Sequence, residues 1–138
     1  MTVRFADGEL HITIRGHSYS SGDSSYPGMD VTAVYKIVEG DEGLKAVRQG
    51  ELAVFPPNFK PGSGKRLAVR QQTIRRMLER RFGKIFEEEM VPEPLELPGR
   101  WADSGKYGLD QWETADGWMV MAWNRLPGSE AAEEETSD

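Results

Sequence analysis

A run of apolar residues at helical spacing, between Lys65 and Met90, constrains the fold of this chain more than any other feature. The positions that recur at intervals of three and four are Leu67, Gln71, Ile74, Leu78, Phe82 and Ile85, all apolar except Gln71. This period predicts a long amphipathic helix over 65–90 that ends before Pro92. Gly83 costs a helix about 1 kcal/mol relative to alanine, so a bend or an early end there is an open alternative.

Two Asp-Gly dipeptides, at 7–8 and 116–117, lie between residues that are typical of strands. Asp-Gly tolerates the positive φ angles of a type I′ turn, which is the commonest turn of two-residue hairpins. The first dipeptide predicts a hairpin over 3–14, with the apolar residues after the turn on one face. The second predicts a hairpin between 107–114 and 118–125.

The segments between the first hairpin and the helix give weaker signals. Residues 16–30 are rich in Ser and Gly and lack periodicity, which predicts a long loop. Residues 31–38 are rich in β-branched residues, which predicts a strand buried on both faces or nearly so. We expect one or two helical turns over 44–49 and a short strand over 51–55.

Together these elements predict an α+β fold, in which a mostly antiparallel sheet of two β-hairpins plus one or two strands carries the long amphipathic helix on one face. The length of 138 residues suits one core, so residues 1–129 are predicted to form a single domain. Residues 130–138 are acidic and lack large apolar side chains, which predicts a disordered acidic tail. The tryptophans at 112, 118 and 123 are predicted to lie in or near the core.

The chain contains no cysteine, which excludes disulfides and thiolate metal sites and favours a reducing compartment. Its first residues lack the apolar stretch of a signal peptide, and no 18 consecutive residues are apolar. The sequence therefore predicts a cytoplasmic protein without a membrane association.

Positive charge is concentrated in the predicted helix. Residues 65–84 hold eight basic residues and one acidic residue, a local charge of +7 in a chain of net charge −6, so the remainder carries −13. At about 100° per residue, six of these cations fall within roughly 140° of one another. They are Arg66, Arg70, Arg76, Arg80, Arg81 and Lys84.

This arrangement predicts an anionic partner for the cationic face. Arginines four residues apart repel one another by a few tenths of a kcal/mol. The acidic run 87–89 would also lie at the C-terminal end of the predicted helix, where the helix dipole favours cations. Three sources of negative charge remain open: the protein's own loops or its 130–138 tail, an acidic protein surface, and nucleic acid.

The leading functional hypothesis is a non-enzymatic binding or regulatory protein, with inhibition as one outcome, that engages an acidic surface of a larger protein or nucleoprotein assembly. The alternative is a nucleic-acid-binding accessory protein that contacts phosphates without sequence specificity, because the sequence holds no zinc-finger, RNP or helix-turn-helix pattern. A small hydrolase is a more distant alternative. The oligomeric state is left open.

Three aromatic residues extend the candidate partner-binding set. Tyr19 and Tyr26 lie in the predicted loop, where tyrosine among Ser and Gly is typical of recognition loops. Trp101 follows a proline-rich connector outside any predicted strand, where it suits a partly exposed anchor.

The remaining motifs do not support catalysis. The segment 61–66, PGSGKR, departs from the phosphate-binding loop pattern, because Phe59 takes the place of its first glycine and Arg66 that of the Ser or Thr. His11 and His17 match no zinc or nucleophile spacing. We therefore assign no catalytic residue, no metal site and no cofactor from the sequence.

Overall fold

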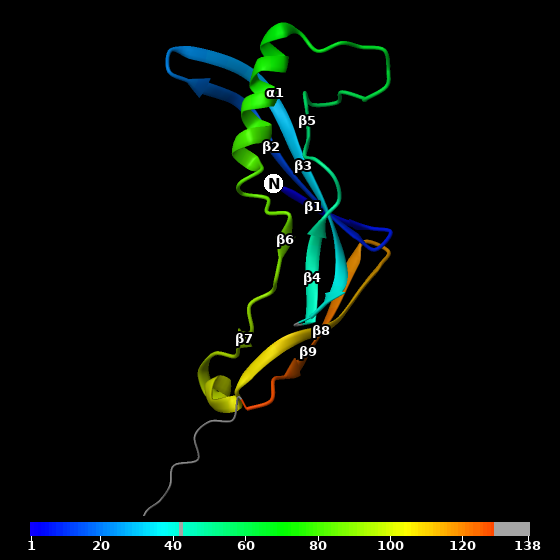
Figure 1. Ribbon diagram of the computed structural model, residues 1–138, viewed down its shortest axis with the longest axis vertical. Helices are drawn as coiled ribbons and strands as arrows, with labels where there is room; N and C mark the ends of the chain where they lie inside the picture. Colours follow the sequence, from blue (N-terminus) through cyan, green and yellow to red (C-terminus); the bar gives the residue numbers. More distant parts are fainter. Residues whose placement is uncertain (42, 129–138) are drawn as a thin grey trace, which may run out of the picture.

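The computed structural model describes residues 1–41 and 43–128, which form two antiparallel sheets and one α-helix (Figure 1). The larger sheet has the strand order β1-β2-β3-β4-β6, with β5 also paired to β3, and the smaller has the order β7-β8-β9. The strands are β1 Thr2–Ala6, β2 Glu9–Ser21, β3 Ser24–Gly40, β4 Gly43–Arg48, β5 Ala53–Phe55, β6 Glu89–Met90, β7 Leu95–Glu96, β8 Lys106–Ala115 and β9 Trp118–Arg125. The helices are α1 Val69–Phe82 and the 3-10 helix η1 Gly99–Ser104. The broad α+β prediction, with antiparallel strands, is confirmed.

Both Asp-Gly dipeptides form the hairpin turns predicted from the sequence. Asp7 and Gly8 have φ angles of 53° and 76°, and β1 pairs with β2 across this turn. Asp116 and Gly117 have φ angles of 51° and 81° between β8 and β9. Aspartate and glycine tolerate this left-handed backbone, so these turns are determined locally.

The loop predicted over 16–30 is wrong, because β2 and β3 continue as paired strands to a turn at Gly22 and Asp23. Tyr19 pairs with Tyr26 across this extension. A β-carbon added at Gly16 would lie 2.0 Å from the Tyr19 hydroxyl oxygen, so the glycine leaves room for the tyrosine side chain. Ladder hydrogen bonds and cross-strand packing therefore outweigh the turn preference of the Ser and Gly residues.

Of the two short elements predicted between 44 and 55, one is wrong and the other is confirmed. Residues 44–49, expected to make helical turns, lie mainly in strand β4, which pairs with the C-terminal part of β3. The short strand expected over 51–55 is confirmed as β5, which pairs with an earlier stretch of β3. Both strands form because the long β3 offers unpaired backbone along that edge.

The helix is shorter than the predicted 65–90, and it ends at the glycine that allowed an early end. Gly83 is the C-cap residue, and the backbone N–H of Phe86 still donates to the Phe82 carbonyl at 2.8 Å. Residues 88–90 then join the sheet, where Arg48 N–H donates to the Glu88 carbonyl at 2.8 Å and β6 pairs with β4. Pairing with the sheet therefore competes with the helix for this segment.

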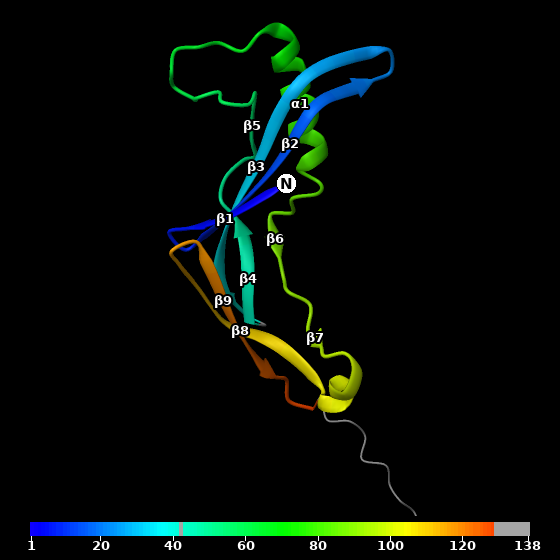
Figure 2. The ribbon, with the colours of Figure 1, turned by 180° about the vertical axis from the view of Figure 1, so that it is seen from behind.

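The core lies between α1 and one face of the larger sheet. Alternate residues of β3 are fully or almost fully buried, which identifies one buried face instead of the two that were expected. Figures 1 and 2, seen from opposite sides, both show α1 along the part of β2 and β3 nearest their turn. The buried apolar residues are Met29, Val31, Ala33, Tyr35, Ala46, Leu52, Val54, Ile74, Leu78 and Phe86.

The smaller sheet lies at the other end of the elongated molecule (Figure 1). Trp112 and Trp123 are half-buried, and the Trp112 ring meets Phe5 edge-on with centroids 6.4 Å apart. The core prediction is wrong for Trp118, which is 76% exposed. Within the described residues, no helix is long and apolar enough to cross a membrane.

Candidate partner-binding surface on α1

Helix α1 places its buried apolar residues and most of its exposed basic residues on opposite sides. Ile74 and Leu78 are buried against the sheet, while Arg76 and Arg80 are exposed on the far side. Arg66, which precedes the helix, and Arg81 and Lys84 at its C-terminal end are exposed as well. We call the five residues Arg66, Arg76, Arg80, Arg81 and Lys84 the cationic α1 surface.

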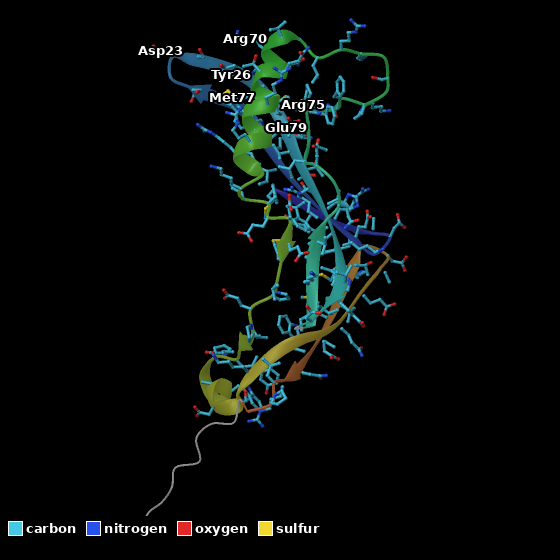
Figure 3. All side chains as sticks on the ribbon, in the orientation of Figure 1. Asp23, Tyr26, Arg70, Arg75, Met77 and Glu79 are labelled. Carbon is cyan, nitrogen blue, oxygen red and sulfur yellow. The ribbon has the colours of Figure 1, made fainter. Side chains whose placement is uncertain are left out.

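Arg70, which the sequence placed in the same set, is bound to the hairpin between β2 and β3. Its guanidinium donates to the Ser25 carbonyl oxygen and lies 6.0 Å from the centre of the Tyr26 ring. Figure 3 labels Arg70 at the start of α1 close to Tyr26. This side chain therefore holds the hairpin against the helix, and it is excluded from the cationic α1 surface.

Arg75 was not among the site residues predicted from the sequence, although the structure gives it a defined position. Its Nε lies 2.7 Å from Glu79 Oε1, and its guanidinium stacks 4.8 Å from the centre of the Phe55 ring. Figure 3 labels Arg75 and Glu79 on α1. The four-residue spacing to Glu79 was visible in the sequence, whereas Phe55 comes from β5.

An open depression of about 420 Å³ lies beside the first half of α1. It is lined by the three arginines Arg66, Arg75 and Arg76, by Glu51 and Glu79, and by Leu67 and Gln72. We call it the Arg66 pocket. It brings residues from the connection between β4 and β5, from the segment before α1 and from α1 itself to one place.

The acids of the described residues form no ion pair with the cationic α1 surface. Glu79 binds Arg75, Glu89 binds Lys45 at 2.9 Å, and Glu88 lies 3.8 Å from Arg48. None of the ion pairs found within 1–41 and 43–128 includes a member of this surface. The acidic tail at 130–138, the other internal source considered, lies outside the described residues.

The acidic run 87–89 does not oppose the helix dipole as the sequence predicted, because the helix ends earlier than expected. Arg80 and Arg81 lie in the last turn of α1, where the helix dipole favours positive charge. The acids at 87–89 follow the helix and do not oppose its C-terminal end. The helix dipole therefore favours Arg80 and Arg81, although like charges four residues apart, such as Arg76 and Arg80, still repel one another.

The tyrosines of the expected loop lie on strands instead. Tyr19 is half-buried, and its hydroxyl donates to the Met29 carbonyl oxygen at 3.2 Å. Burial raises the pKa of this hydroxyl, and the charge of Asp30 raises it further. Both Tyr19 and Tyr26 pack against the core, which indicates a structural role and removes the loop-based reason for assigning them to a partner.

Trp101 lies apart from the other candidate residues. It is in η1, 54% exposed, with the Arg100 guanidinium 5.2 Å from the centre of its ring. Figure 1 shows this yellow segment at the opposite end of the molecule from α1. The structure therefore does not bring Trp101 to the cationic α1 surface.

The two histidines have different neighbours. His11 Nε2 lies 3.2 Å from Glu9 Oε2, while His17 is exposed on the outer part of β2. Asp30, expected in the loop, accepts two hydrogen bonds from Arg15 at 2.9 and 2.8 Å, which lower the pKa of its carboxyl. No group of three metal-ligating side chains occurs among the residues that the structure describes.

Comparisons of the chain with protein-family models, with curated proteins and with solved structures found no match. Any inference about function therefore rests on the charge and geometry of the cationic α1 surface.

Proposed function

We propose that this chain is a non-enzymatic binding or regulatory protein that engages an acidic surface of a larger protein assembly through the cationic α1 surface. Occupation of that surface on the assembly inhibits or modulates it, because the bound chain excludes other partners from the same acidic site. The fold holds the surface in place: Ile74 and Leu78 anchor α1 on the sheet, and Arg70 fixes the nearby hairpin.

One observation carries this proposal. Five cations are exposed together, and no acid of the described residues forms an ion pair with any of them. Arg76 and Arg80 are also four residues apart on the helix, where like charges destabilise it by roughly 0.2–0.5 kcal/mol. Carboxylates of a partner relieve that repulsion and accept bidentate hydrogen bonds from arginine.

Two features favour a protein partner over nucleic acid. The chain as a whole carries a charge of −6, so beyond the immediate contact it is repelled more strongly by a continuous phosphate backbone than by an acidic patch of limited size. Val69 at the start of α1 is 79% exposed, and Ile85 just after the helix is 63% exposed. Apolar side chains at both ends of a basic row suit the mixed chemistry of a protein interface.

A charge-reversal experiment tests the proposal with poly-L-glutamate as the acidic probe. The variant R76E/R80E is expected to bind the probe at least about tenfold more weakly than the wild type at low salt. The matched control is R4E/R125E, which changes the net charge equally at exposed positions outside α1. Equal binding by R76E/R80E and the wild type would contradict the proposal.

The same salt series with a random-sequence DNA duplex and with single-stranded RNA tests the alternative. Tighter, steeply salt-dependent binding to either nucleic acid, lost in R76E/R80E, would replace the proposal with the nucleic-acid accessory function. A variant with glutamines at 130 and 133–135 tests the acidic segment 130–138 as an internal competitor. Competition predicts tighter binding of poly-L-glutamate by this variant than by the wild type.

A further inference from the structure

The Arg66 pocket differs from the rest of the cationic α1 surface, because it is concave and lined by both signs of charge. We infer that this pocket receives a single carboxylate side chain, Glu or Asp, from an acidic segment of the partner protein. This inference rests on the proposed function and names the contact that makes recognition of the acidic partner specific.

The walls of the pocket are held in place before any ligand binds. Arg75 is positioned by Glu79 at 2.7 Å and by the face of Phe55, whose ring stacks on Phe59 with centroids 5.2 Å apart. A guanidinium that is already oriented loses less conformational entropy on binding than a free one. One side of the pocket is therefore rigid.

The chain that carries Arg66 is also anchored. Gln72 donates from its side-chain amide to the Leu67 carbonyl oxygen at 2.9 Å, and Ala68 N–H donates to Gln71 Oε1 at 2.9 Å. These bonds tie the residues after Arg66 to the first turn of α1. Arg66 and Arg76 therefore approach the pocket from fixed backbone positions and, within the described residues, have no ion-pair partner.

The charge of the pocket selects the ligand. Three arginines and two glutamates give a local charge of +1, which one carboxylate neutralises. A phosphate dianion, or a nucleic acid backbone with its closely spaced charges, brings more negative charge than the pocket neutralises and is repelled more strongly by the exposed Glu51 than one carboxylate is. Leu67 adds an apolar wall suited to the methylene groups of a glutamate. The chemistry therefore fits an acidic side chain of a protein better than a phosphate.

The test compares two pairs of arginines with the same probe, poly-L-glutamate. R66Q/R76Q removes the two unpaired arginines of the pocket, and R80Q/R81Q removes the same charge from the surface outside it. We expect R66Q/R76Q to weaken binding about fivefold more than R80Q/R81Q does. In the wild type, the side-chain NMR signals of Arg66 and Arg76 are expected to shift at lower probe concentrations than those of Arg80 and Arg81. Amide spectra of both variants test whether they fold.

The possible results separate this inference from the proposed function. If both variants bind the probe equally weakly and all four arginine signals shift equally, the assignment of a carboxylate to the Arg66 pocket is wrong, while the proposed function still holds. No binding of the probe by the wild type at low salt overturns both. Inorganic phosphate is the second probe: larger shifts of Arg66 and Arg76 with phosphate than with N-acetylglutamate amide would overturn the assignment to a carboxylate.

Discussion

The two ends of the molecule use hairpins of the same kind but differ in what covers them. At one end, α1 lies on the hairpin of β2 and β3, and Val31 and Tyr35 are completely buried. At the other end, β8 and β9 form a hairpin whose outer face has no helix over it among the described residues. Trp118 and Val120, which share that face, are 76% and 67% exposed.

The difference shows that burial comes from a second layer and not from the apolar character of a strand. A sheet needs another layer of secondary structure to exclude water from a face. Trp118 is larger than Val31 and more apolar than Tyr35, yet it stays exposed because nothing in the described chain packs on it. The cationic α1 surface belongs to the covered end, where a rigid core supports the helix.

The largest effect is expected from Leu78→Ala, which opens a cavity between α1 and the sheet. Leu78 is 3% exposed, and such a substitution lowers the free energy of unfolding by about 3 kcal/mol. Urea denaturation followed by circular dichroism measures the change. Val120→Ala at the other end serves as the comparison, and an equally large loss there would mean that the β9 face is covered in solution.

A smaller effect is expected from Gly16→Ala, because the new β-carbon would displace the Tyr19 ring. Overpacking of this kind lowers the free energy of unfolding by roughly 1–2 kcal/mol. If displacement of the ring is the cause, the free energy of unfolding falls less in the double variant G16A/Y19A than the sum of the losses in the two single variants. Ser18→Ala, at an exposed position of the same strand, is the control. Additive effects of the Gly16 and Tyr19 substitutions would contradict the explanation.

The Arg15–Asp30 pair predicts a pH dependence at the covered end. Hydrogen bonds from Arg15 lower the folded-state pKa of Asp30 below its unfolded value near 3.9, so the stabilisation is present above about pH 4 and is lost as the pH falls through the lower folded-state value. In Asp30→Asn, the midpoint of thermal unfolding should therefore decrease less with falling pH than in the wild type. Asp110→Asn in β8 controls for the loss of one carboxylate, and equal acid slopes for wild type and Asp30→Asn would disprove the link.

The smallest effect is expected from Trp118→Ser on the exposed face of β9. The free energy of unfolding should change by no more than about 0.5 kcal/mol, because the side chain is already mostly in water. Tryptophan fluorescence of the variant should be less sensitive to acrylamide quenching than that of the wild type. A loss above about 1 kcal/mol would show that this end has a covering contact, which would remove the contrast between the two ends.

Several local features were readable from the residues alone. The turns at 7–8 and 116–117 depend on φ angles that Asp and Gly adopt at low cost, so neighbours in the chain suffice to predict them. The period of α1 and its basic composition were equally visible, and Gly83 marked the point where the helix ends. These features depend on residues a few positions apart.

The extent of the strands and the shape of the site depended on distant partners. Residues 16–30 became strands because each side of the hairpin pairs with the other, and residues 88–90 left the helix pattern to pair with β4. The composition of 65–84 predicted a cationic face, but the Arg66 pocket also needs Glu51 from the β4–β5 connection, and Phe55 of β5 holds its Arg75. Backbone turns are set by local sterics, whereas burial, strand pairing and charge neutralisation are set by groups that only folding brings together.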